Sequence, residues 1–272
     1  MKRIDMIGSP LAHVLTPALL NARLAGNDLG LSVTPREIGT SDLAAYVAAV
    51  RGKDAVMGLV VTTPLKEAIC GHLDRKTALV ELIGSCNCIR ADDRSWIGAN
   101  FDGFGFARAL ADAGVPLKGK RVLLMGCGGA GKAIAERVAG EGAAALFISD
   151  PMAGRAAAFA HRLGSKTVAA GDFPSGGIDI VVNASPLGMK PDDPSPVPAE
   201  IVAGCSVVVD IVVAADSRLR RFARERGKRV VEGEAMVRSQ IDLFRSFILS
   251  GATSEPAAMR HAAGGALAES AS

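Results

Sequence analysis

The chain has 272 residues, 49% of them hydrophobic, and a formal net charge of +3. At about 150 residues per domain, this length allows two domains of modest size, and the apolar content is too high for a disordered chain. The small net charge gives no reason to expect a nucleic-acid or membrane partner, and it suits a small anionic ligand.

The sequence also limits the compartment and the metal chemistry. No run of about 18 apolar residues is present that could cross a bilayer, and the charged start Met1-Lys2-Arg3 has no signal-peptide core. The five cysteines are scattered, and the four histidines lack metal-ligand spacing. We therefore expect a reduced, cytoplasmic protein without a metal site.

Short apolar runs alternate with helical patterns along the chain, which indicates an α/β protein. Thr16 is expected to cap a helix with Pro17 at its first position, and Pro64 is expected to open another helix in the same way. A third helix is expected to follow Asp102. Strands are expected at 4–7, 56–62, 88–90, 96–99, 121–125, 144–149, 178–182 and 207–213. Further helices are expected at 132–139, 153–163, 234–249 and 255–267.

A glycine-rich loop follows the apolar run 121–125. Its sequence, Gly126-Cys127-Gly128-Gly129-Ala130-Gly131, fits G-x-G-x-x-G between a buried strand and a helix. In that setting the first glycine allows a tight turn, the second lets the backbone approach a pyrophosphate, and the third lets helix and strand pack closely. The stretch therefore predicts a dinucleotide site.

Asp150 ends the next expected strand, 19 positions after Gly131. This is close to the spacing of about 20 that is typical of an acid binding the 2′-hydroxyl of the adenosine ribose. Such a carboxylate favours NAD and repels the 2′-phosphate of NADP, although Arg155 could weaken that preference. The alternative is that Asp150 only caps a helix.

Two other interpretations of the loop stay open. Gly126, Gly131 and Lys132 nearly match the phosphate loop of nucleotide triphosphatases, but Ala133 lacks the hydroxyl that magnesium requires. A glycine turn without any ligand is the simplest alternative.

Six stretches, in order, resemble motifs of the shikimate/quinate dehydrogenase family; they are 8–13, 62–66, 86–88, 100–103, 183–189 and 233–240. The resemblance implies an N-terminal α/β substrate domain and a Rossmann-type domain with a doubly wound parallel sheet. The implied bounds are 1–102 with 238–272 for the substrate domain and 103–237 for the dinucleotide domain. It also implies hydride transfer between a nicotinamide and a ring hydroxyl or ketone of a cyclic polyhydroxy acid, in a monomer or a homodimer.

Lys66 and Asp102 match the catalytic pair of that family. Oxidising an alcohol requires a base for its proton, and reducing the ketone requires an acid. We expect Lys66 in the first turn of a helix, where the helix dipole disfavours its ammonium form, and Asp102 beside it to hold the side chain. The alternatives are an exposed lysine and a helix cap.

The resemblance implies further site residues. Substrate-binding positions are matched by Thr16, Thr62, Asn87 and Gln240. Their alternatives are a helix cap, a strand end, a turn and a solvent-facing residue. Cofactor positions beyond the glycine loop and Asp150 are matched by Asn183, Ser185, Ile211, Gly233 and Met236.

Three positions depart from the family pattern. Val14 replaces one hydroxyl of the motif that binds the substrate carboxylate, Val60 replaces an asparagine, and Val213 replaces a tyrosine. Each lost hydrogen bond to a charged group costs about tenfold to a hundredfold in affinity. The sequence therefore predicts an alicyclic hydroxy acid or polyol less acidic than shikimate, or, as an alternative, an NAD-binding sensor without turnover.

Overall fold

The computed structural model describes residues 2–25, 30–92, 95–165, 168–171, 174, 176–213 and 216–250. The chain divides into two compact units, Met1–Asp102 with Val237–Ser272 and Gly103–Met236. The helix expected at 255–267 lies outside the described residues. Within them, no helix combines the length and apolar character needed to cross a membrane.

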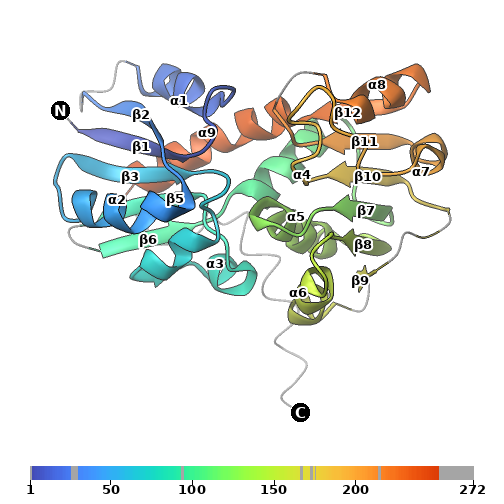
Figure 1. Cartoon of the computed structure of the whole chain (residues 1–272), viewed down its shortest axis with the longest axis horizontal. Helices are drawn as coiled ribbons and strands as arrows, with labels where there is room; N and C mark the ends of the chain where they lie inside the picture. Colours follow the sequence, from blue (N-terminus) through green and yellow to red (C-terminus); the bar gives the residue numbers. More distant parts are fainter. Residues whose placement is uncertain are drawn as a thin grey trace, which may run out of the picture. The chain divides into compact units, whose positions relative to one another are not determined.

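The first unit contains a six-stranded mixed sheet in the order β2-β1-β3-β5-β6-β4 (Figure 1). Strand β1 pairs in parallel with β2 and β3, whereas β5 is antiparallel to both β3 and β6. The strands are β1 (Arg3–Gly8), β2 (Ser32–Glu37), β3 (Val56–Val61), β4 (Arg75–Lys76), β5 (Cys88–Asp92) and β6 (Ser95–Ala99). The helices are α1 (Thr16–Leu24), η1 (Thr40–Asp42), α2 (Leu43–Val50), η2 (Ala68–His72) and α3 (Ala78–Ile83).

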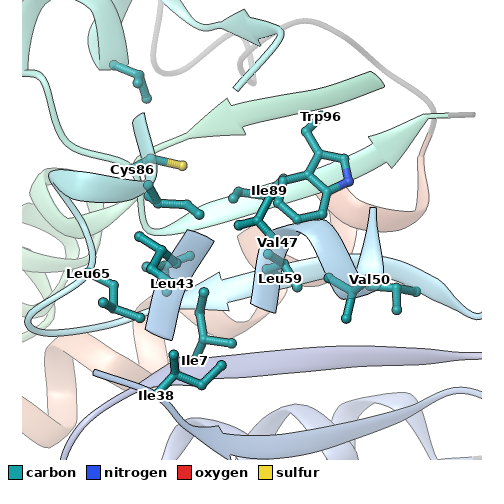
Figure 2. Packing of buried hydrophobic residues seen from close by; sticks show 14 residues of the cluster. Ile7, Ile38, Leu43, Val47, Val50, Leu59, Leu65, Cys86, Ile89 and Trp96 are labelled. Carbon is teal, nitrogen blue, oxygen red and sulfur yellow. The ribbon is translucent and has the colours of Figure 1, made fainter. Parts of the chain in front are cut away.

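Successive side chains of a strand point to opposite faces, so this sheet has two cores. On one face Leu59 and Ile89 pack with Leu43 and Val47 of α2 and with Trp96 (Figure 2). The opposite face is covered by the part of α9 (Gly233–Leu249) that belongs to this unit. A Cβ at Gly58 of β3 would overlap the Ile89 carbonyl oxygen of β5 and lie 3.1 Å from Ile248 of α9, so glycine at 58 allows close packing with both.

The second unit contains six strands that are all parallel, in the order β12-β11-β10-β7-β8-β9 (Figure 1). The strands are β7 (Arg121–Met125), β8 (Ala145–Ser149), β9 (Val168–Ala170), β10 (Ile180–Asn183), β11 (Val207–Asp210) and β12 (Arg229–Glu232). The helices are α4 (Asp102–Asp112), α5 (Gly129–Gly140), α6 (Arg155–Leu163), α7 (Ala199–Gly204) and α8 (Arg218–Glu225).

Chain order reverses at β7 in this sheet. The chain first adds β8 and β9 on one side and then returns to add β10, β11 and β12 on the other. This order is that of the doubly wound dinucleotide-binding fold, in which ligands lie at the carboxyl ends of the strands near the reversal. The expected fold class, α/β with a Rossmann-type parallel sheet, is confirmed.

Four expectations about the elements were wrong. Thr16 is the first residue of α1 and not its cap; the cap position is Leu15, without a side-chain hydrogen bond. No α-helix begins at Pro64, because residues 63–67 form turns that lead into the short 3₁₀ helix η2. The strand expected at 207–213 ends at Asp210. Helix α5 begins at Gly129, three residues earlier than expected.

Candidate active site

Polar residues of the first unit gather at one edge of its sheet. The parallel strands β1, β3 and β6 all end at this edge, and the antiparallel strand β5 begins there. Asn87 immediately precedes β5, and its N–H donates to the Ala99 carbonyl oxygen at the end of β6 over 3.0 Å. The turn carrying Lys66 follows β3 and is fixed by the Cys86 N–H, which donates to the Lys66 carbonyl oxygen over 2.8 Å.

Lys66 and Asp102 form an ion pair at this edge. The distance from Lys66 Nζ to Asp102 Oδ2 is 2.7 Å, and the two side chains are 14% and 3% exposed. Lys66 is therefore not the exposed lysine of the alternative interpretation, and the Asp102 carboxylate does not serve as a helix cap. Lys66 lies in a turn rather than in a helix, so the expected effect of a helix dipole on it was wrong.

The backbone at Asp102 is fixed by the side chain of Asn100. The Asp102 N–H donates to Asn100 Oδ1 over 2.9 Å, and Asn100 Nδ2 donates to the Ser85 carbonyl oxygen over 3.2 Å. Asn100 and Ser85 were not singled out from the sequence. An asparagine two residues before a helix start is a local signal that could have identified Asn100.

Gln240 and Asn87 extend the pair into a row of four polar residues. Gln240 Nε2 donates to Asp102 Oδ1 over 3.5 Å, and Gln240 Oε1 accepts from Asn87 Nδ2 over 3.3 Å. Asn87 Oδ1 accepts from the Phe101 N–H over 2.9 Å. Both amides are buried, so Gln240 does not face solvent and Asn87 is more than a turn residue.

Thr62 and Thr16 lie after β3 and β1. The Thr62 N–H donates to the Ile7 carbonyl oxygen over 2.9 Å, and a Cβ at Gly8 would overlap the Thr62 methyl group. In the described part of the chain, neither threonine hydroxyl is hydrogen-bonded; Thr16 is buried and Thr62 is half-buried. Val60 is buried in β3, and Val14 and Val213 are half-buried.

The glycine loop of the second unit connects β7 to α5. Gly126 has φ +96°, and a Cβ there would lie 2.8 Å from the Ala184 backbone. A Cβ at Gly131 would overlap the Gly126 carbonyl oxygen, whereas a Cβ at Gly128 would meet nothing within 4 Å. Gly126 and Gly131 thus serve close packing, and Gly128 leaves open space.

The open space at Gly128 lies at the N-terminus of a 12-residue helix. Gly128 is the cap of α5 and provides no side-chain hydrogen bond, and the first turn, which includes Gly129 and Ala130, has no acidic residue. Backbone N–H groups and the helix dipole favour an anion at such a position. The loop therefore fits a pyrophosphate.

Asp150 follows β8 and contacts the same loop. Its Oδ2 accepts from the Cys127 N–H over 2.7 Å, and its Oδ1 accepts from the Met152 N–H over 2.9 Å. Helix α6 is capped by Gly154, so Asp150 is not a helix cap. A carboxylate has about four lone-pair sites, so Asp150 keeps acceptor capacity for a ligand hydroxyl.

Asn183 and Ser185 shape the turn after β10. Asn183 Oδ1 accepts from the Ser185 hydroxyl over 2.6 Å, and Asn183 Nδ2 donates to the Leu187 carbonyl oxygen over 2.8 Å. Ile211 follows β11 and is half-buried, and a Cβ at Gly233 would overlap its carbonyl oxygen. Met236 is buried in the first turn of α9. All these residues lie at or after the carboxyl ends of parallel strands.

Sequence comparison identifies the family to which the chain belongs. The family model "Shikimate dehydrogenase substrate binding domain" matches residues 6–89. The NADP(+)-named shikimate dehydrogenase of Rubrobacter xylanophilus is 34% identical over 273 residues, which cover 96% of this chain and 95% of the relative. The chain belongs to the shikimate dehydrogenase family.

Solved structures of family-like proteins cover most of the chain. The shikimate 5-dehydrogenase of Thermus thermophilus, in complex with NADP(H) and shikimate, has a TM-score of 0.81 at 30% identity and covers 92% of this chain and 94% of its own. The ligand-free 5-ketofructose reductase of Gluconobacter sp. strain CHM43 has a TM-score of 0.76 at 27% identity, with 92% and 93% covered. Proteins of similar architecture are thus named for shikimate and for 5-ketofructose.

Proposed function

We propose that the protein is an NAD-preferring dehydrogenase that interconverts a ring hydroxyl and a ketone on a shikimate- or quinate-like hydroxy acid or a related polyol. The observation that carries this proposal is the nearly buried Lys66–Asp102 ion pair, which places an ammonium group beside a carboxylate at the carboxyl ends of β1, β3 and β6. Membership in the shikimate dehydrogenase family supports the reaction class.

The first unit supplies the proton chemistry in this proposal. A bound nicotinamide dinucleotide provides or takes up the hydride. Lys66 Nζ donates a proton to the ketone oxygen during reduction and takes it back during oxidation. Asp102 holds the ammonium group in place, and Gln240 holds the other oxygen of Asp102. Asn87, Gln240, Thr16 and Thr62 bind the substrate hydroxyls.

The second unit binds the dinucleotide in this proposal. The N–H groups at Gly128, Gly129 and Ala130 bind the pyrophosphate, and Asp150 binds the adenosine ribose. The relatives are named for NADP(+) and do not support a preference for NAD. That preference is proposed from Asp150 alone, because its negative charge repels the 2′-phosphate of NADP. Ile211, Gly233 and Met236 line the nicotinamide.

The substrate proposal rests on the carboxylate-binding half of the site. Val14, Val60 and Val213 offer no hydrogen bond where the family pattern has polar groups. The likeness to a 5-ketofructose reductase supports a neutral hydroxylated substrate, because that protein is named for a sugar ketone.

The test is a panel of cyclic hydroxy acids, polyols and their ketones, assayed with NAD and with NADP. Lys66→Met should lower kcat about a hundredfold to ten-thousandfold, while NADH binding stays unchanged. Lys76→Met, at an exposed lysine of the same unit, is the matched control and should be as active as the wild type. Turnover retained by Lys66→Met would remove Lys66 from the mechanism.

The alternatives give distinct results in the same assays. A sensor without catalysis would bind NADH and turn over no member of the panel. A nucleotide triphosphatase would hydrolyse ATP with magnesium, for which Ala133, fully buried in α5, offers no hydroxyl ligand.

A further inference from the structure

Asp210, the last residue of β11, is a fully buried carboxylate outside the catalytic pair. Its Oδ2 accepts from the Ser217 hydroxyl over 2.6 Å, and its Oδ1 accepts from Asn183 Nδ2 over 3.0 Å and from the Val212 N–H over 3.3 Å. Arg220 Nε lies 3.4 Å from Oδ2. Burial raises the pKa of the Asp210 carboxyl group, and these hydrogen bonds and the arginine oppose that rise.

Asp210 reaches the turn after β10 through Asn183. The amide nitrogen that donates to Asp210 also donates to the Leu187 carbonyl oxygen, and the amide oxygen accepts from the N–H and the hydroxyl of Ser185. The same turn packs on the start of α8, because a Cβ at Gly188 would lie 2.9 Å from Ser217 Cβ. One carboxylate therefore joins the turn after β10, the turn after β11 and the first residues of α8.

The location of Asp210 and its partners within the second unit indicates which part of a bound dinucleotide they lie near. A doubly wound sheet has two mononucleotide-binding halves that meet where strand order reverses. Asp150 follows β8, on one side of β7, whereas Asn183 and Asp210 end β10 and β11 on the other. If Asp150 binds the adenosine ribose, the turns held by Asp210 face the nicotinamide half.

We propose that Asp210 is a positioning residue that holds the turns after β10 and β11 in the shape required by the nicotinamide half of the cofactor. This proposal rests on the proposed function, because it requires that the second unit binds a dinucleotide. Asp210 itself acts through Asn183 and does not touch the reacting atoms.

The negative charge of Asp210 is needed for this role. The Arg220 side chain is 5% exposed, and its other acidic neighbours, Glu232 and Asp216, are about half exposed. Asparagine at 210 would still accept from Asn183 and Val212, but its amide NH₂ would face the Arg220 guanidinium. Two donors would then oppose each other in a buried position, and the turns would shift to separate them.

The experiment compares two ligands that differ in the nicotinamide half. NADH and ADP-ribose share the adenosine and the pyrophosphate, and only NADH carries the nicotinamide. We expect Asp210→Asn to weaken NADH binding by about tenfold and to leave ADP-ribose binding within about twofold of the wild type, as measured by calorimetry. The control is Asp179→Asn, because Asp179 caps the amino end of the same sheet and accepts from the Arg121 N–H there. It should leave both affinities unchanged.

Each other result has a defined meaning. Equal weakening of both ligands, or no weakening of either, overturns the role of Asp210 while leaving the proposed function intact. Failure of the wild type to bind either ligand overturns the proposed function, and this assignment with it. If Asp210→Asn does not fold, Ser217→Ala is tested in its place, because it removes one hydrogen bond to the Asp210 carboxylate. That variant should also weaken NADH selectively, and equal NADH affinity there overturns the proposal.

Discussion

Asn87 and Gln240 lie 153 residues apart in the sequence, yet Asn87 Nδ2 donates to Gln240 Oε1 over 3.3 Å. The contact joins the start of β5 to the middle of α9. This helix is the last described element of the chain, and its second part packs on the sheet of the first unit. Because Gln240 also donates to Asp102, this contact completes the row that begins at Lys66. The closing helix is therefore part of the candidate site and not only a cover for the sheet.

Gln240→Leu should raise the KM for the organic substrate about tenfold to a hundredfold, since it removes an amide near charged and polar groups in a buried place. NADH affinity should not change, because the residue belongs to the first unit. Steady-state kinetics with varied substrate and NADH titration measure the two effects. Arg245→Gln on the exposed side of the same helix is the control, and an unchanged KM in Gln240→Leu would remove Gln240 from substrate binding.

The glycine loop allows a contrast between two alanine substitutions. Gly126→Ala should destabilise the fold, because φ is +96° and the new Cβ would lie 2.8 Å from the Ala184 backbone. Gly128→Ala should keep the wild-type Tm, since its Cβ meets open space, but should weaken dinucleotide binding about tenfold by occupying the position of the pyrophosphate. Thermal unfolding and NADH titration separate the two, and full NADH affinity in Gly128→Ala would contradict the assigned position.

The parts of the fold predicted from the sequence are those with strong local signals. The strand 121–125, its glycine loop and the acid at 150 combine apolar run, turn residues and spacing, and the structure has β7, the turn and β8 there. The strands β5 and β6, which pair with each other, were likewise predicted from two apolar runs. In these places the local preference and the tertiary environment agree.

Other elements carry weak or conflicting local signals. Strand β2 is an edge strand with the sequence S-V-T-P-R-E, in which Val33 is the one buried side chain, so no apolar pattern marks it. Strand β12 follows the basic helix α8, and the charges of Arg226, Lys228 and Arg229 obscure it. The sequence at Pro64 suggests a helix start because proline is common both at the first position of a helix and in turns.

The candidate site divides in the same way. Lys66 and Asp102 were predicted as a pair through the family resemblance. The 2.7 Å distance between Lys66 Nζ and Asp102 Oδ2 depends on tertiary packing, so no local sequence pattern could predict it. The role of Asp210 was not predicted, because a single acid at the end of an apolar strand has no local feature that reveals its four partners, which come from β10, the turn after β11 and the start of α8.

Asp150→Asn should narrow the preference for NAD over NADP. Asparagine retains an acceptor for the Cys127 N–H or the Met152 N–H but loses the charge that repels a 2′-phosphate. The ratio of kcat/KM for the two cofactors should fall about tenfold, which corresponds to about 1.4 kcal/mol. A wild-type enzyme that already prefers NADP would contradict the role given to Asp150.

Tyr46 provides a test of stability that is independent of function. Its hydroxyl donates to the buried Asp5 Oδ2 over 2.8 Å, so Tyr46→Phe leaves that oxygen without this donor and should cost about 1–3 kcal/mol of unfolding free energy at neutral pH. Burial, then the hydrogen bond to Asp5, raise the pKa of Tyr46 well above its usual value of 10.0.

The sign of the pH dependence follows from that shift. The folded chain keeps Tyr46 protonated where the unfolded chain loses the proton, so the contribution of Tyr46 is complete below about pH 10 and falls by about 1.4 kcal/mol per pH unit above it. Tyr46→Phe lacks this loss, so the stability difference between the two proteins should shrink above pH 10. Denaturant unfolding of the two proteins at neutral and alkaline pH measures this difference.

Because Tyr46 is the only tyrosine, the ultraviolet absorbance of tyrosinate reports its ionisation directly. A midpoint near pH 10 in the folded protein would show that Tyr46 is neither buried nor bound to Asp5.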